Sequence, residues 1–236
     1  VSAYANVHTR VRGMIGNLLS DETIARLSAC PDLGTLIAKL DETSYASCLA
    51  ASEETIKSSR RAAYEIRKKL TRDYKIIIEH APSFARQLLV QLFRLYEVDN
   101  LKAVLRGIEV GEDWEKIRYP LFPVEDYPSL PFADMVQSGT VESAIALLHN
   151  TDYEVDLKPA LTRYHDEESL FPVEVAIDLN YWQRLWDQID TLPKQDQKIT
   201  RKLIGMMVDK NNLTWAARYR VFHRFSESEI INYTLP

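Results

Sequence analysis

The 236-residue sequence is poor in glycine and cysteine and has no long apolar run. Seven glycines are few for turn-dense β-folds or for glycine-rich loops that cradle phosphates. Its two cysteines, Cys30 and Cys48, lack the spacing of metal ligands and are typical of a reducing compartment. No stretch approaches the roughly 20 apolar residues that a membrane-spanning helix needs. These absences favour a helical protein without a transmembrane segment.

Signatures of catalysis and metal binding are missing as well. The sequence has no Gly-Lys-Ser/Thr phosphate loop, no Gly-x-Ser-x-Gly turn and no His-Glu-x-x-His pair. The run 165–168 combines one histidine with three acidic residues, but four consecutive positions cannot share a helix face, so we expect a solvated acidic loop. A net charge of −5 disfavours nucleic-acid binding, which needs phosphate neutralisation. We therefore expect no catalytic site, metal, cofactor, nucleic acid or small-molecule ligand.

Apolar residues recur at three- and four-residue steps through most of the chain, which predicts an all-α fold. In the first half we expect helices over 7–19, 31–40, 52–79 and 84–106, with Gly107 as the final stop. Four prolines between Tyr119 and Pro131 then exclude a helix and predict an extended linker. In the second half the pattern predicts helices over 136–149 (broken at Gly139), 172–189 (ended by Pro193) and 198–225.

A short motif occurs twice in the chain. An acidic residue precedes an Asn-Leu pair, and an arginine follows the asparagine by six positions. The first copy is Asp99, Asn100, Leu101 and Arg106; the second is Asp209, Asn212, Leu213 and Arg218. Similar stretches, Leu40 to Tyr45 and Leu148 to Tyr153, precede the two copies. Solenoid repeats recur about every 20–50 residues. Asn100 and Asn212 are much further apart in the sequence than this, which indicates a duplicated helical lobe.

The motif has two interpretations. Its residues could form a binding constellation, or they could hold each lobe together. In the structural interpretation Asn and Asp satisfy backbone groups while Arg pairs with a carboxylate across the lobe. Unique sites are rarely duplicated whole, so we favour the structural role.

Eight lysines and arginines gather between Lys57 and Lys75 in a chain that is acidic as a whole. Such a run is commonly a solvated helix face. The alternative is a docking surface for an acidic protein partner, whose encounter would be steered by charge. The candidate contact residues are Arg67, Lys68 and Arg72.

The segment Tyr4 to Met14 (YANVHTRVRGM) resembles the opening of the C subunits of the V-type (A-type) ATP synthases, which are equivalent to the d subunit of the vacuolar proton ATPase. That family also carries an Asp-x-x-Asn-Leu-x-x-x-x-x-Arg device, which the copy from Asp209 to Arg218 matches in full. In the first copy Glu97 takes the acidic place. In addition, the residues Glu174, Asp178 and Tyr181 are similar to the family's Glu-x-x-x-Asp-x-x-Tyr helix.

The resemblance implies a funnel-like, noncatalytic protein of three similar helical lobes. This chain has two of the expected three, over 1–127 and 128–236, and we expect it to be a piece of a longer protein. The implied role is a central-stalk rotor subunit, cytoplasmic and peripheral to the membrane. It would couple the axle subunits to the membrane proteolipid ring during ATP-driven or ATP-producing ion transport. These residues fit a motor that transports protons and one that transports sodium ions equally. They also fit ATP synthesis and ATP hydrolysis equally.

A stand-alone helical adaptor or regulatory protein-interaction module is the alternative, since it could share the same lobe design. Co-purification with ring and axle subunits would favour the rotor part. A complex that lacks them would favour the adaptor.

Overall fold

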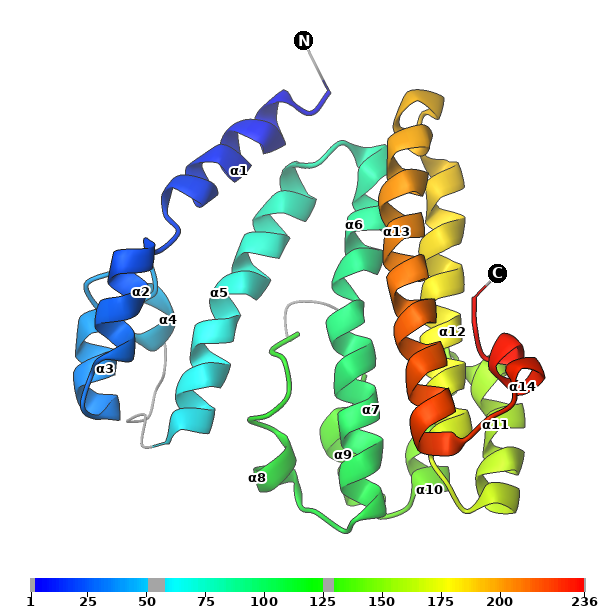
Figure 1. The fold of residues 1–236 in the computed structure, drawn as a ribbon. Helices are drawn as coiled ribbons and strands as arrows, with labels where there is room; N and C mark the ends of the chain where they lie inside the picture. The colour runs from blue at the N-terminus through cyan, green and yellow to red at the C-terminus, as the bar shows by residue number, and fades with distance from the viewer. Residues whose placement is uncertain (1–2, 51–57, 125–129, 236) are drawn as a thin grey trace. The chain divides into compact units, whose positions relative to one another are not determined.

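A computed structural model describes residues 3–50, 58–124 and 130–235 of the chain. All regular secondary structure in these ranges is helical (Figure 1). The all-α prediction is therefore confirmed for the described residues, which include no strand.

The chain forms two compact units. Unit 1 comprises Val1–Pro82 and Gly111–Leu130, and unit 2 comprises Ser83–Val110 and Pro131–Pro236. These units divide the chain differently from the sequence repeat, because Ser83–Val110 precedes residue 128 yet packs within unit 2. The lobes over 1–127 and 128–236 stay a prediction.

Unit 1 is built around one long helix. Its helices are α1 (Ala5–Gly16), α2 (Asp21–Ser28), α3 (Leu33–Leu40), α4 (Ala46–Ala50), α5 (Ser59–His80) and α8 (Trp114–Ile117). Both α1 and α4 pack against α5. Four of these helices start at a side-chain N-cap, because the side chains of Ser20, Asp32, Ser58 and Asp113 each accept a hydrogen bond from the backbone three residues on. The predicted helix over 52–79 thus corresponds to α5, and residues 52–57 lie outside the described ranges.

The proline-rich segment is not helical over 119–124, as predicted, but it packs against α5 and is not a free linker. The hydroxyl of Thr71 donates to the carbonyl of Pro123 at 2.5 Å, and Arg67 donates to the carbonyl of Pro120 at 3.0 Å. Leu121 and Val124 are buried. Burial of these apolar side chains explains why the segment stays on the helix. Residues 125–129 lie outside the described ranges.

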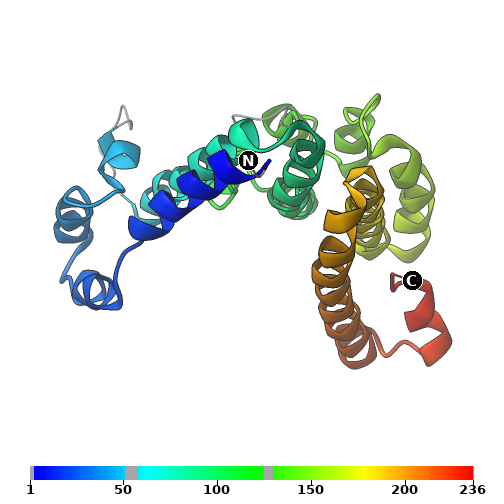
Figure 2. The same cartoon turned by 90° about the horizontal axis from the view of Figure 1, so that it is seen from above.

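Unit 2 contains most of the core. It is formed by α6 (Ser83–Phe93), α7 (Leu95–Glu109), α9 (Phe132–Gln137), α10 (Val141–Ala146), α11 (Glu154–Glu167), α12 (Phe171–Asp187), the 3₁₀ helix η1 (Gln188–Thr191), α13 (Lys194–Arg218), the π-helical η2 (Tyr219–His223) and α14 (Glu227–Asn232). Its central element is α12, which contacts α6, α7, α11 and α13 (Figure 1 and Figure 2). The predicted stripe of α12 is buried: Val173, Ile177, Tyr181 and Leu185.

Several predicted helix boundaries are corrected by the structure. Gly107 does not stop the helix, because burial of Leu105 and Ile108 extends α7 to Glu109, and Gly111, with φ +71°, follows in the turn. The predicted continuous helix over 84–106 is interrupted at Arg94, between α6 and α7. Gly139, in contrast, has φ +79° and breaks the chain between α9 and α10 as predicted.

Two further corrections concern the second half. Pro193 acts as the N-cap residue of α13, so this helix begins at Lys194 and not at Lys198. The expected acidic loop is instead the last turn of α11, which continues to Glu167 and is capped by Glu168 in the left-handed conformation (φ 48°). Its exposed charges point to solvent along the helix, so a loop was not required to keep them hydrated.

Candidate functional site

The first motif copy lies on α7, and its arginine contacts α12 within unit 2. Leu101 is 0% exposed and Asn100 is buried. Arg106 donates two hydrogen bonds to the carboxylate of Glu174 on α12, at 2.5 and 2.8 Å. This planar, bidentate geometry fixes direction as well as distance. The arginine of this copy thus joins two helices.

A second ion pair lies one turn away on the same two helices. Lys102 donates to Asp178 at 2.7 Å and lies 3.4 Å from Asp99. Positions 102 and 106 of α7, and positions 174 and 178 of α12, are each four residues apart, so the antiparallel helices match two cations to two carboxylates. Burial raises the pKa of Asp178, and the nearby Lys102 partly offsets this effect.

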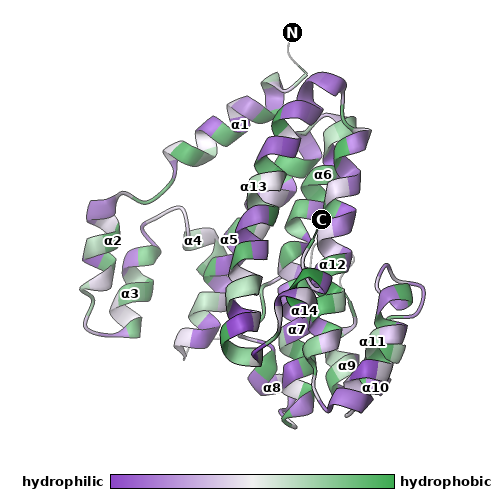
Figure 3. Ribbon diagram, turned by 45° about the vertical axis from the view of Figure 1, so that its right-hand side comes forward, coloured by the Kyte–Doolittle hydropathy of each residue, from purple (hydrophilic) through white to green (hydrophobic). Residues whose placement is uncertain are grey.

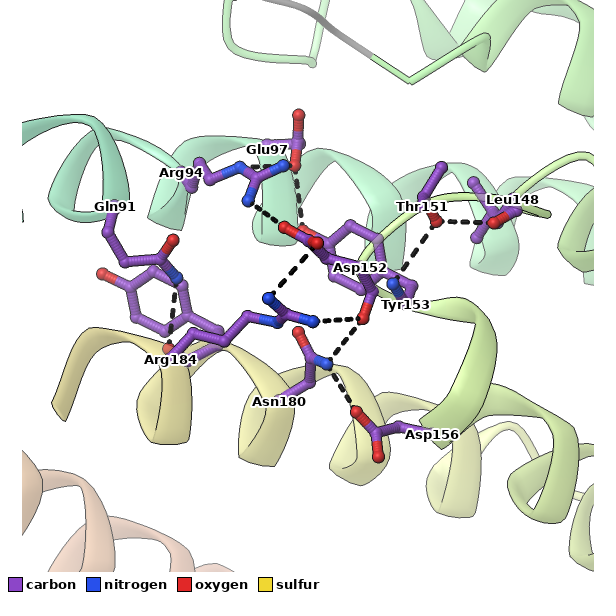
Figure 4. Close-up of polar contacts among 11 residues, drawn as sticks. Gln91, Arg94, Glu97, Leu148, Thr151, Asp152, Tyr153, Asp156, Asn180 and Arg184 are labelled. Carbon is purple, nitrogen blue, oxygen red and sulfur yellow. Dashed lines mark hydrogen bonds and ion pairs between the residues drawn. The ribbon is translucent and has the colours of Figure 1, made fainter. Parts of the chain in front are cut away.

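A larger polar network lies at the other end of α7 (Figure 4). Arg94 donates to the carboxylate of Asp152 at 2.6 Å, and Arg184 contacts the same carboxylate at 3.2 Å. The amide of Asn180 donates to the carbonyl of Asp152 at 2.9 Å and to the carboxylate of Asp156 at 2.5 Å. The bond from Arg94 holds the pKa of Asp152 below its usual value. Asp152 therefore connects α7, α11 and α12.

Glu97 is the most buried carboxylate of this network, at 4% exposure. The hydroxyl of Tyr153 donates to it at 2.9 Å, and the guanidinium of Arg94 lies 3.6 Å away. Burial raises the pKa of Glu97, while Arg94 and Tyr153 act in the opposite direction. The pKa of Tyr153 is also raised, first by burial and then by the charge of Glu97. Glu97 is therefore a buried ionisable side chain that joins Arg94 and Tyr153 within the core of unit 2.

The turns before the two motif copies have the same hydrogen bonds. The hydroxyl of Thr151 donates to the carbonyl of Leu148 at 2.6 Å, and the backbone N–H of Tyr153 donates to that hydroxyl at 3.3 Å. In unit 1, Thr43 bonds to the Leu40 carbonyl at 2.6 Å and accepts from the Tyr45 N–H at 3.2 Å. The sequence similarity of these stretches thus corresponds to a shared local conformation.

The second motif copy has a different environment. The side-chain amide of Asn212 donates to the carbonyl of Leu235 at 2.8 Å and accepts from its N–H at 3.0 Å. Leu213, however, is 74% exposed, and Asp209 is exposed as well. Arg218 is exposed and has no carboxylate partner among the residues that the structure describes. Within this copy, Asn212 is the residue whose side chain bonds to a distant part of the chain, the backbone of Leu235.

The candidate docking cations on α5 have partners within unit 1. Arg67 bonds to Pro120, and Lys68 lies 3.1 Å from the buried Glu65. Arg72 donates to the hydroxyl of Ser47 and to the thiol of Cys48, both at 3.4 Å. A docking role for Arg67, Lys68 and Arg72 stays a prediction.

The contacts of the network were not predicted from the sequence. Arg94, Asn180 and Arg184 belong to no repeated motif, and each lies on a helix or turn whose neighbours only the fold defines. Asp152 lies in the repeated stretch Leu148 to Tyr153, but repetition alone did not indicate its partners. For the ion pairs a signal existed, since Lys102 and Arg106 have the same four-residue spacing as Glu174 and Asp178.

Within the described ranges, no group of histidine, cysteine and acidic residues is arranged to hold a metal ion. No helix in those ranges is long and apolar enough to cross a membrane. In the described ranges the fold and the site define an all-helical protein in which polar clusters join helices to one another. A family model for the ATP synthase (C/AC39) subunit matches residues 7–236, and the chain belongs to this family.

Individual relatives are distant but cover most of the chain. The A-type ATP synthase C subunit of Methanocaldococcus jannaschii is 24% identical over 213 residues, which is 90% of this chain and 53% of that protein. The equivalent protein of Methanococcoides burtonii is 25% identical over 220 residues, with 93% and 60% covered. That of Haloferax volcanii is 22% identical over 212 residues, with 90% and 60% covered. This chain thus spans between 53% and 60% of the length of these relatives.

Proposed function

We propose that the chain is a noncatalytic central-stalk rotor subunit of a V-type/A-type ATPase. It couples the axle subunits to the membrane proteolipid ring during ATP-driven or ATP-producing proton or sodium transport, and it works in the cytoplasm at the membrane periphery. The single observation that carries this proposal is the family match over residues 7–236. The relatives, which are A-type ATP synthase C subunits by name, support the assignment.

The construction of unit 2 suits the transmission of torque. A coupling part must keep its helices in register under load, and two matched ion pairs resist sliding of α7 along α12. The network around Asp152 ties the same helices to α11. In our proposal the lobes over 1–127 and 128–236 contribute to a funnel-like socket that receives the axle.

The proposal is tested by purifying the tagged chain from its own cells in mild detergent. We expect catalytic, axle and proteolipid subunits in the same complex by mass spectrometry. The matched control is an untagged strain taken through the same purification. Recovery of the chain in a complex without ring and axle subunits would contradict the rotor role and favour the stand-alone adaptor.

Coupling can be tested separately from assembly. Arg106→Glu places like charges beside Glu174, and we expect ATP synthesis driven by an ion gradient to fall in membrane vesicles. The charge-swapped double variant Arg106→Glu/Glu174→Arg restores the pair and is expected to restore synthesis. ATP hydrolysis by the catalytic head is the internal control, since this proposal places no catalytic residue in the chain. Equal synthesis in all three proteins would contradict a role for the α7–α12 contact in coupling.

A further inference from the structure

The chain makes an exposed turn at the C-terminal end of α13. Helix η2 extends α13, and the chain then turns and leads into α14 (Figure 1). Two neighbouring apolar side chains in this turn are strongly exposed, Val221 at 68% and Phe222 at 75%. They form an apolar apex that the described part of unit 2 leaves in solvent. With the arginines around it, this apex makes up what we call the α13 tip: Arg218, Arg220, Val221, Phe222 and Arg224.

The tip is fixed at its base by contacts within unit 2. The ring of the buried Tyr219 packs edge-on against Phe171, with 5.2 Å between the ring centroids. Phe225 packs against the same ring at 5.6 Å, and its N–H donates to the carbonyl of Tyr219 at 3.3 Å. The side chain of Arg220 donates to the carbonyl of Phe225 at 2.9 Å. Because these contacts close the turn, the apex does not have to be ordered before it binds a surface.

The sequence around the apex is cationic. Between Asp209 and Glu227 the chain has four lysines and arginines and no acidic residue, although its net charge is −5. Figure 3 shows hydrophobic residues among the hydrophilic ones along α13. Arg218 and Arg224 are exposed, and neither has an ion-pair partner among the residues that the structure describes. These charges are therefore available to anions outside the chain.

The directions of the three arginines distinguish between two kinds of anionic partner. Successive residues of an α-helix turn by about 100°, so Arg218 and Arg220 lie on nearly opposite sides of the helix axis, and Arg224 follows the end of η2. A single row of carboxylates on a partner helix could not meet all three. Lipid phosphates surround a point of insertion on every side, and the hydrocarbon beneath them accepts apolar side chains. The tip thus fits an anionic lipid surface better than an acidic helix.

We propose that the α13 tip binds an anionic membrane surface. Its apolar apex enters the boundary between headgroups and acyl chains, and its three arginines contact lipid phosphates. The inference depends on exposure, charge and the closed turn within unit 2, and it does not depend on the proposed rotor function. A chain that failed to assemble with a rotary ATPase could still bind such a membrane, and a rotor subunit could be held by protein contacts alone.

Binding is tested by co-sedimentation of the whole chain with phosphatidylcholine vesicles that contain about one third phosphatidylserine. We expect binding at about 0.05 M salt that weakens at about 0.5 M, and little binding to vesicles of phosphatidylcholine alone. Phe222→Ser should weaken binding about tenfold and Arg218→Gln about fivefold. The matched control is Val155→Ser, because Val155 is 78% exposed on α11 away from the tip, and we expect a change of at most about twofold. Circular dichroism verifies that each variant keeps its helix content.

Insertion is tested with an environment-sensitive fluorophore attached at Phe222→Cys, in a chain whose Cys30 and Cys48 are replaced by alanine. Its emission should shift to the blue and rise in intensity when anionic vesicles are added. The same label at Ile199→Cys is the control, because Ile199 is 65% exposed on the same helix but lies 23 residues, about 35 Å, from the apex. Insertion reaches only about 5–10 Å, so this label should stay in water.

Four results would overturn the proposal. They are absence of vesicle binding, equal binding to neutral and anionic vesicles, binding that Phe222→Ser leaves unchanged, and an equal response of the two labels, which would mean that the whole of α13 lies on the membrane. A polyglutamate peptide separates the alternative partner. If it binds while vesicles do not, and Arg218→Gln weakens that binding, the tip docks an acidic protein and not a membrane.

Discussion

The two motif leucines differ in what surrounds them, and mutation should reveal this. Leu101 is 0% exposed, so Leu101→Ala leaves a cavity in unit 2 and is expected to lower the free energy of unfolding by about 2–5 kcal/mol. Leu213 is 74% exposed, and Leu213→Ala should change that free energy by no more than about 0.5 kcal/mol. Urea denaturation measures both. Equal losses would mean that the two copies are equally buried in solution.

Glu97 is expected to make stability depend on pH in a characteristic direction. Burial raises its pKa above the ordinary 4.5, so the folded chain holds this proton to higher pH than the unfolded chain. The contribution of Glu97 to the free energy of unfolding is therefore fully present below pH 4.5, and it is lost as the pH rises through the pKa of Glu97 in the folded chain. Urea denaturation across this range should show that loss in the wild type, and Glu97→Gln should remove it.

Glu154 provides the opposite control for the same measurement. The bond from Lys158 and the backbone N–H of Asn150 lower the pKa of this exposed carboxylate. The contribution of Glu154 to the free energy of unfolding is present above its pKa in the unfolded chain, and it is lost as the pH falls through its pKa in the folded chain. Glu154→Gln should therefore alter only the acid side of the profile. A Glu97→Gln profile parallel to the wild type would contradict the effect of burial on Glu97.

Replacing a glycine by alanine should lower the stability of the chain at Gly139 and raise it at Gly205. Gly139 separates α9 from α10 with φ +79°, and a Cβ there meets no atom within 4 Å, so the cost of Gly139→Ala is conformational, about 1–2 kcal/mol. Gly205 lies inside α13 with equally open space around it, and Gly205→Ala should stabilise the helix by about 0.5–1 kcal/mol. Thermal melts followed by circular dichroism compare the two. Destabilisation by Gly205→Ala would indicate a close neighbour at that position.

The helices could be predicted from the sequence because their signals are local. Apolar periodicity located α12, and a glycine located the break at Gly139. Boundaries that depend on tertiary burial could not be predicted in this way. Gly107 has the identity of a stop residue, but the buried side chains around it extend α7 by two residues. The break at Arg94 has neither glycine nor proline to mark it.

The candidate site was predictable to a similar degree. Repetition identified Asn100, Leu101 and Arg106, and resemblance identified Glu174 and Asp178. The network around Asp152 required knowledge of which helices are neighbours. The exposure of Ile199, Leu203, Met206 and Leu213 on α13 could not be recognised from the sequence, because apolar residues at three- and four-residue steps have the same pattern as a buried helix face. Their exposure is visible only in the fold.

At the scale of the whole molecule, the two copies of the sequence motif lie in different electrostatic settings. Arg106 of the first copy and the neighbouring Lys102 pair with carboxylates of α12, whereas α13, which carries the second copy, has six lysines and arginines and two aspartates. In a parallel pairing of two such helices Lys210 would face Lys210, and like charges at facing positions oppose association.

This repulsion predicts how the chain behaves alone in solution. A parallel pairing through α13 brings Lys210 against Lys210, and the net charge of −5 adds general repulsion between molecules. We expect a monomer by sedimentation velocity at micromolar concentration in about 0.05 M salt, where the Debye length exceeds about 10 Å. Salt near 1 M screens the lysines, so weak association through the exposed apolar side chains of α13 should increase, and Leu213→Asp should abolish that increase. A stable dimer at low salt that Leu213→Asp dissolves would contradict the expected repulsion.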